Sequence, residues 1–405
     1  MLVATLLLPC PPAASAQEVT YRGWLEARGT LFPQEGATDP ERLIGDARGR
    51  LEVFLKPAQW LQLAVGVDAL ANSYRQVESR VALDVSDRRL RRPALSLRRA
   101  STTLTHGAFL VEVGKQFVRW GKADVVTPTD RFAPRDFLHV IDAEFLAVRA
   151  ARVALAASSD TVEGVVSVFT PSRTPLLDQR WTIAPSGVGT IALDDQASRF
   201  PSRPQVGVRW SHTGRGHEHS ASFFEGFNHL PNLDVTAPRA EPRLVLVRTF
   251  PTLRMYGGDV AVPTGWATFK GEVAYFQTRT AGTDEYLLYV VQVERQTGEW
   301  LLLGGYAGEV VTKAQAFANF APDRGSARTL IGRASYTIDP NRSAAVEAAV
   351  RHNGDAAYVK GEFSKATGRH WRTTVTGTVI RGEPDDFLGQ FRRNSHAGVS
   401  VRYSF

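Results

Sequence analysis

Cysteine is almost absent from this sequence, and long apolar runs are absent after its first 16 residues. Cys10 is the only cysteine among the 405 residues, and it lies in a segment that we expect to be removed. The exported chain therefore has no disulfide framework and no thiolate nucleophile. No run of 18 or more apolar residues follows, so no membrane-spanning helix is predicted. No linker, composition shift or low-complexity tract divides the chain.

The first residues, MLVATLLLPCPPAASA, have the features of a secretory signal peptide. A short apolar run precedes Ala14-Ser15-Ala16, so we predict cleavage after Ala16 and a mature start at Gln17. A lipoprotein signal is the alternative, but Pro9 is unfavourable directly before a lipidated Cys10. The segment contains no charged residue, so the formal net charge of +7 belongs to the mature chain. This surplus favours anionic headgroups or anionic solutes without choosing between them.

The mature sequence alternates apolar and polar residues in segments of roughly ten residues, which is typical of outer-membrane barrels. The first strand is expected at about Val19–Phe32 and the last at about Ser395–Phe405. Short turns, such as Gln296-Thr297-Gly298, alternate with longer polar connections. We predict an all-β fold over residues 17–405, a transmembrane antiparallel β-barrel of about 18 strands, with 16 as the alternative. A soluble periplasmic sandwich or propeller is the competing fold.

The C-terminal sequence VSVRYSF favours the barrel. Val399, Val401, Tyr403 and Phe405 alternate with smaller or polar residues, so they share one face of a strand. This ending resembles the C-terminal signature of bacterial outer-membrane proteins, which the barrel-assembly machinery reads. The resemblance implies a Gram-negative outer-membrane location, with lipid around the barrel and the assembly machinery bound at Phe405.

Charged side chains in the strands are expected to face the lumen, because Arg or Lys at the bilayer midplane costs about 2–4 kcal/mol. Their basic excess favours weak anion selectivity, although neighbouring pairs such as Lys270 and Glu272 also simply neutralise each other. The predicted lumen wall comprises Arg48, Arg50, Glu52, Glu112, Gln116, Lys270, Glu272, Arg333, Arg351, Lys360, Glu362 and Arg402.

One charged stretch, GKQFVRWGKADVVTPTDRFAPRDF from Gly114 to Phe137, differs from the rest. Pro128 and Pro134 lack an N–H, so the stretch cannot continue a sheet. We predict a long loop that folds into the pore, where opposed charges would create a transverse field. The alternative role is that the same charges pair with the wall and pin the loop. The candidate constriction residues are Arg119, Lys122, Asp124, Asp130, Arg131, Arg135 and Asp136.

The same stretch carries a family resemblance. Four of its segments resemble a Gly-x-Gln…Trp-Gly…Asp…Pro-x-Asp motif of uncharacterised porin-like barrels of Gram-negative bacteria. They are Gly114-Lys115-Gln116, Trp120-Gly121-Lys122-Ala123-Asp124, Pro128-Thr129-Asp130 and Pro134-Arg135-Asp136. Further segments that resemble this family are Tyr256-Gly257-Gly258-Asp259 and Lys270-Gly271-Glu272-x-Ala274-Tyr275. Lys115 stands where arginine is common, which keeps the charge. The resemblance implies an outer-membrane barrel and a role in transport.

No enzyme, cofactor, metal or nucleic-acid role is predicted. The sequence has no Gly-x-Ser-x-Gly elbow, no His-Glu-x-x-His helix and no glycine-rich phosphate loop. His217-Glu218-His219 places two imidazoles on one face of a strand, but no third ligand is evident from sequence. We therefore predict a porin-like channel for passive diffusion of small hydrophilic solutes, anions included. The alternative is a non-conducting barrel with a surface, adhesion or assembly role.

Overall fold

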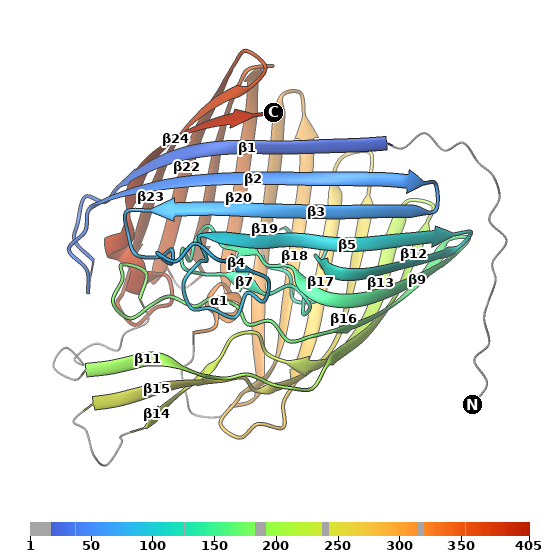
Figure 1. The fold of residues 1–405 in the computed structure, drawn as a ribbon, viewed down its shortest axis with the longest axis horizontal. Helices are drawn as coiled ribbons and strands as arrows, with labels where there is room; N and C mark the ends of the chain where they lie inside the picture. Colours follow the sequence, from blue (N-terminus) through green and yellow to red (C-terminus); the bar gives the residue numbers. More distant parts are fainter. Residues whose placement is uncertain are drawn as a thin grey trace.

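A computed structural model describes residues 18–36, 38–124, 126–182, 192–236, 243–314, 320–352 and 354–405. The predicted signal peptide lies outside these residues. Within them, 18 strands form one antiparallel barrel (Figure 1). These strands are β1 (Glu18–Leu31), β2 (Leu43–Ala58), β3 (Leu61–Asn72), β5 (Leu95–His106), β6 (Phe109–Gln116), β9 (Val148–Ala157), β10 (Asp160–Ser167), β12 (Gln205–Gly214), β13 (His217–Phe227), β16 (Thr252–Pro263), β17 (Thr268–Gln277), β18 (Glu285–Thr297), β19 (Trp300–Lys313), β20 (Thr329–Asp339), β21 (Arg342–Arg351), β22 (Ala356–Thr367), β23 (Trp371–Gly382) and β24 (His396–Ser404).

The last strand closes the barrel against the first. Leu31 in β1 lies opposite Ala397 in β24, and Trp24 lies opposite Ser404. The terminal residue extends this ladder, because Gly23 and Phe405 exchange two backbone hydrogen bonds of 2.9 and 3.0 Å. Closure leaves the barrel without a free edge, as a lipid environment requires. The predicted fold and the count of 18 strands are confirmed.

Short turns lie at one end of the barrel and long loops at the other. The turns between β5 and β6 and between β18 and β19 contain Gly107 and Gly298, whose φ angles are +56° and +54°. Glycine adopts this left-handed conformation without steric cost. In outer-membrane barrels, the short turns lie on the periplasmic side and the long loops outside the cell.

Side chains alternate between the two faces of the wall. In β24, Val399 and Val401 are exposed on the outer surface, whereas Ser400 is buried. An outer ring of tryptophans marks the short-turn end, as expected for a membrane interface; it contains Trp60, Trp266, Trp300 and Trp371. The sequence also predicts Trp24 and Trp120 in such a ring, because both lie near expected strand ends, but the structure places them elsewhere. Trp24 stacks with Arg50 and Arg402, and Trp120 is buried in a loop. No helix among the described residues has the length and apolar character to cross a bilayer.

The smaller elements belong to the long loops. The alternation in the sequence predicts strands at about Ala108–Arg119 and Glu144–Ala156, but β6 ends at Gln116 and β9 begins at Val148. Glu144 instead lies in β8 (Glu144–Phe145), which pairs with β7 (Arg135–Asp136). A separate sheet of β11, β15 and β14 lies along the lower edge of Figure 1. The other elements are β4 (Leu83–Asp84), β11 (Ala192–Arg199), β14 (Asn232–Thr236), β15 (Arg243–Thr249), α1 (Pro322–Gly325) and the 3₁₀ helix Gly389–Asn394.

Candidate functional site

The connection between β6 and β9, residues 117–147, folds into the barrel; we name it the inward loop. Its apolar side chains pack against the wall in one buried cluster. Trp120 contacts Phe132 edge to face at 5.1 Å between ring centres, and Phe132 contacts Phe224 of β13 at 4.9 Å. All three rings are at most 2 % exposed. Burial of these large rings holds the loop against β13 and its neighbours.

A single wall carboxylate, Glu272 of β17, anchors the first part of the loop. One oxygen accepts hydrogen bonds from the backbone N–H groups of Lys122 and Ala123, each 3.0 Å long. The other accepts from the N–H and the hydroxyl of Thr129, both at 2.8 Å. Glu272 is only 3 % exposed, so these four donors replace the water that its carboxylate loses.

Asp130 organises the same part of the loop from within. Its Oδ1 accepts hydrogen bonds from the N–H groups of Trp120 (2.5 Å) and Gly121 (2.7 Å), and its Oδ2 lies 3.2 Å from Nε of Arg119. The Trp120 indole donates to Glu163 of β10 at 2.6 Å. Asp130 therefore acts as a cap for loop amides, and its carboxylate is buried.

Two segments of the motif that are distant in sequence meet at this anchor. A Cβ on Gly121 would lie 2.8 Å from Thr127 and 3.0 Å from Glu272, and a Cβ on Gly257 would lie 2.8 Å from Thr129. Real Cβ contacts are not this short, so both positions require glycine for close approach. The Trp-Gly and Pro-x-Asp segments thus pack on the Tyr-Gly-Gly-Asp and Lys-Gly-Glu segments of the wall.

The other predicted constriction residues of this part also contact protein groups. Lys122 pairs with Glu218 of β13. Asp124 accepts hydrogen bonds from Lys270 at 2.9 Å and from Gln292. Arg131 donates to Asp323 at 3.1 Å. Arg135 lies 4.3 Å above the Phe145 ring and donates to Thr127 at 2.7 Å.

Asp136 begins a different region, a buried chain of alternating charges. Its carboxylate accepts from Arg92 at 2.9 Å and from Arg173 at 3.1 Å. Arg173 also contacts Asp87 at 2.8 Å, and Asp87 contacts Lys115 of β6 at 2.5 Å. Burial raises the pKa of Asp136, but the guanidinium groups of Arg92 and Arg173 outweigh burial and hold that pKa well below its usual value. This chain of charges links the loops that carry Asp87, Asp136 and Arg173 to one another and, through Lys115, to the wall.

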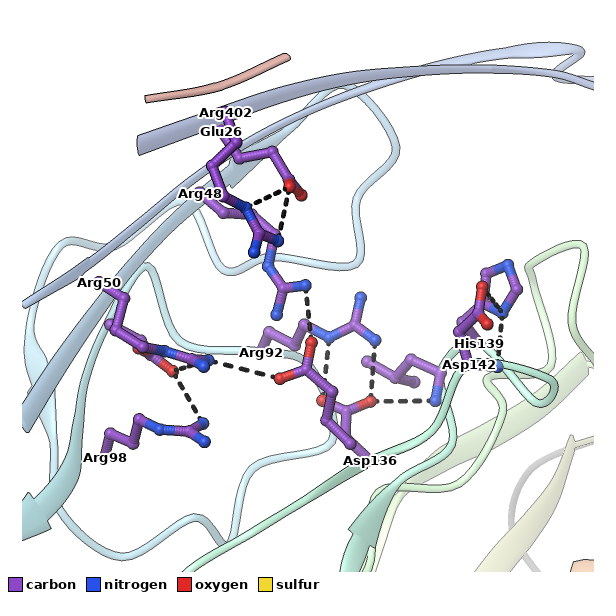
Figure 2. Close-up of polar contacts among 12 residues, drawn as sticks. Glu26, Arg48, Arg50, Arg92, Arg98, Asp136, His139, Asp142 and Arg402 are labelled. Atoms are coloured by element: carbon purple, nitrogen blue, oxygen red, sulfur yellow. Dashed lines mark hydrogen bonds and ion pairs between the residues drawn. The ribbon is translucent and has the colours of Figure 1, made fainter. Parts of the chain in front are cut away.

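Beside this chain lies a cavity of about 570 Å³ between the inward loop and the wall of β1–β3, β5 and β22–β24. Figure 2 shows wall arginines Arg48, Arg50 and Arg98 on one side, with Asp136 and Asp142 of the loop on the other. Two loop carboxylates reach the wall: Glu144 lies 2.7 Å from Arg48 and 3.4 Å from Arg50, and Asp142 pairs with Lys360.

The charges that line this cavity are balanced in number but separated in space. The wall contributes more bases, and the loops contribute more acids. From the strands come Arg28, Arg48, Arg98, Lys360, Arg372 and Arg402 against Glu26, Asp46, Asp68 and Glu362. From the loops come Arg92 and Arg173 against Asp87, Asp136, Asp142 and Glu144. The result is a field across the lumen rather than a strong net charge.

His139 lines the cavity as a neutral imidazole. Its ring contacts Trp181 at 4.5 Å and His396 at 5.4 Å between ring centres. The backbone N–H of Asp142 donates to its Nδ1 at 3.2 Å. Burial lowers the pKa of His139 to about 3, despite the opposing effect of the Asp142 carboxylate. The residue therefore contributes hydrogen bonding and ring surface rather than charge at neutral pH.

The predicted wall residues all lie on the side of the strands that faces the loops and the cavities. Glu52 accepts from Arg22 (2.8 Å), Glu112 lies 3.9 Å from Arg152, and Gln116 donates to Ala150 (3.0 Å). Further ion pairs join Arg402 to Glu26 (2.7 Å), Arg333 to Glu347 (3.3 Å), Arg351 to Asp386 (3.0 Å) and Lys270 to Glu294 (2.9 Å). Lys360 and Glu362 both line the 570 Å³ cavity.

Sequence reasoning missed several cavity residues: Arg92, Arg98, His139, Asp142, Glu144 and Arg173. Three of them, His139, Asp142 and Glu144, follow the charged stretch directly, and the next strand was expected to begin at Glu144. The short spacing of Asp136, Asp142 and Glu144 was the available signal, because three carboxylates within nine residues do not fit a lipid-facing strand.

Comparisons with known proteins show likeness in fold but not in sequence. No protein-family model matches the chain, and no curated protein matches it. A BenF-like porin from Pseudomonas fluorescens Pf-5 superposes with a TM-score of 0.55 at 10 % identity, covering 96 % of this chain and 98 % of that one. Acinetobacter baumannii OccAB4 (TM-score 0.54) and Pseudomonas aeruginosa OpdK with vanillate (0.53) are also 10 % identical, and each match covers 95 % of this chain and 98 % of the other. The chain thus has the barrel fold of outer-membrane porins.

Proposed function

We propose that this protein is an outer-membrane channel through which small hydrophilic solutes, anions included, diffuse passively. The observation that carries the proposal is the charged cavity of about 570 Å³ between the inward loop and the wall. A barrel with an apolar outer face and a polar, hollow interior is the arrangement that bacterial porins use. The proposed activity is conduction, without chemical conversion of the solute.

The charge distribution supports selection by orientation. Wall arginines face loop carboxylates, so a solute with a dipole is turned as it passes between them. Arg28 and Arg372 line the cavity without an ion pair to any residue that the structure describes, which leaves them available to a carboxylate or phosphate solute. OpdK, which shares the fold, has been solved with vanillate, an organic anion. On these grounds we propose that this channel admits organic anions.

The second candidate is a closed barrel with a surface, adhesion or assembly role. The contacts that favour it are the ion pairs of Glu144 with Arg48 and of Asp142 with Lys360, because both join the loop to the wall across the lumen. For conduction, these pairs must leave a path beside them or exchange partners with the solute.

The remaining parts of the proposal concern export, assembly and the constriction. The chain is exported by its N-terminal signal, cleaved after Ala16, and Phe405 is the contact for the barrel-assembly machinery. The motif around Trp120 is typical of a porin-like family. Its structural role in this chain is to hold the inward loop in place. Of the predicted constriction residues, Asp136 acts at the cavity, whereas Asp124, Asp130 and Lys122 fasten the loop.

Planar-bilayer conductance under a salt gradient tests the proposal. Purified protein is expected to give discrete single-channel currents, with a reversal potential whose sign indicates anion selectivity. Arg28→Ala combined with Arg372→Ala should reduce the anion-to-cation permeability ratio several-fold. Arg342→Ala, at the short turn between β20 and β21 and outside the lining of the cavity, should not change it. A protein that is folded but conducts no current at any salt concentration would overturn the channel in favour of the closed barrel.

A further inference from the structure

A cluster of three histidines lies on the outer face of the barrel at its short-turn end. His212 in β12 lies directly opposite His219 in β13, and His217 lies two residues before His219 on the same face. The ring centres are 5.2 Å (His212–His219), 5.6 Å (His217–His219) and 5.9 Å (His212–His217) apart. The three imidazoles therefore form a compact triangle that spans one hairpin.

The triangle faces away from the lumen. His212 has the same orientation along β12 as Val208 and Trp210, which are 52 % and 39 % exposed on the outer surface. His219 alternates in β13 with Ser220, which is buried toward the interior. The site is therefore separated from the proposed channel by the barrel wall, and the inference does not depend on conduction.

A carboxylate orients one of the three rings. Oδ1 of Asp160, at the start of β10, lies 3.1 Å from Nδ1 of His212 and accepts a 2.9 Å hydrogen bond from the Trp210 indole. Histidines that bind metals usually direct one ring nitrogen to a carboxylate in this way, which fixes the tautomer and makes the other nitrogen a better ligand. Asp160 thus prepares Nε2 of His212 for coordination.

We propose that His212, His217 and His219 bind a divalent transition-metal ion such as Zn²⁺, Ni²⁺ or Cu²⁺. Three imidazoles are an established ligand set for zinc, and imidazole suits copper and nickel equally. Metal–nitrogen bonds of about 2.0–2.1 Å place the ring centres of neighbouring ligands roughly 5–6 Å apart, which matches the triangle. A fourth position remains for water or an exogenous ligand.

The ring orientations define what binding requires. Among the described residues, no three histidine, cysteine or carboxylate side chains are arranged to hold a metal ion as they stand. The planes of His217 and His219 lie 9° apart, so these rings stack on each other. The side chain of His212 is 27 % exposed, and His217 lies at the turn. Rotation of exposed side chains between rotamers is fast and inexpensive, so the metal selects a converging arrangement of the same three rings.

Calorimetric titration of the full chain in detergent at pH 7.5, without a polyhistidine tag, tests the site. Zn²⁺ or Ni²⁺ is expected to bind with one ion per chain. His219→Ala should weaken the affinity at least tenfold, and Asp160→Asn should weaken it by about 10- to 100-fold. His106→Ala is the matched control, because His106 is exposed at the end of another hairpin on the same side, and its affinity should equal that of the wild type.

Tryptophan fluorescence provides a second readout at the site. The Trp210 ring lies 5.2 Å from the His219 ring, so bound Cu²⁺ should quench it. Trp210→Phe should remove that quenching while calorimetry still detects binding. Heat-modified migration in detergent gels checks the folding of each variant, and His217→Gln replaces His219→Ala if the latter does not fold. Equal metal affinity of the wild type and the folded histidine variant, or no binding up to about 1 mM metal, would overturn the proposal.

Discussion

The two halves of the inward loop use their charges differently. In residues 119–131, backbone amides donate to Glu272 and Asp130, and the contacts are buried among apolar rings. In residues 135–145, carboxylates face arginines, and Asp142 and Glu144 reach the opposite wall beside a cavity. Carboxylates that accept backbone amides fix the path of a chain, whereas carboxylates paired with mobile side chains remain able to act on a solute.

The largest effect is expected at the junction of the halves. Asp136→Asn leaves Arg92 and Arg173 without their shared carboxylate, and Arg173 is only 5 % exposed. Loss of one partner of a buried ion pair typically costs about 3–5 kcal/mol. Chemical unfolding in detergent, followed by tryptophan fluorescence, should detect this loss of stability. Asp385→Asn, at an exposed loop position, should be neutral, and equal stabilities of the two variants would contradict a structural role for the charge chain.

The same variant has a defined pH dependence. The folded-state pKa of Asp136 is depressed, so its contribution to stability is fully present above the unfolded-state value of about 3.9 and is lost as pH falls below it. The stability difference between the wild type and Asp136→Asn should therefore be constant from pH 7 to about pH 5 and shrink below about pH 4. A difference that shrinks already between pH 7 and pH 5 would exclude a strongly stabilised carboxylate.

A smaller loss of stability, but a clear change in conductance, is expected in the first half. Glu272→Ala leaves four donors of the loop without their acceptor, at a cost of about 2–3 kcal/mol. The loop should detach from β17, and single-channel current should become larger and noisier. Glu362→Ala removes a wall carboxylate that lines the cavity without anchoring the loop. If both variants gave the same quiet channel as the wild type, Glu272 would not hold the loop.

The barrel could be predicted from the sequence because its signal repeats. Each of the 18 strands alternates apolar and polar residues with period two, so 18 weak signals agree. The cost of a charge in lipid indicates which face is the lumen, and the apolar, aromatic side of the C-terminal strand supports the same fold. The wall residues followed from the same alternation. The route of the inward loop could not be predicted, because Glu272 lies more than 130 residues beyond the backbone amides from which it accepts hydrogen bonds. Charge density alone located the loop, but it could not separate anchoring carboxylates from those at the cavity.

The smallest effect on selectivity is expected for Arg131→Ala combined with Arg135→Ala. The sequence placed both arginines among the candidate constriction residues of the loop. Arg131 pairs with Asp323, and Arg135 is held between the Phe145 ring and Thr127; neither lines the 570 Å³ cavity. Burial lowers the pKa of Arg135 from its usual value, consistent with a site away from water. The reversal potential should therefore move less than in the Arg28→Ala, Arg372→Ala variant. A larger shift would place the selectivity filter at Arg131 and Arg135 rather than beside the 570 Å³ cavity.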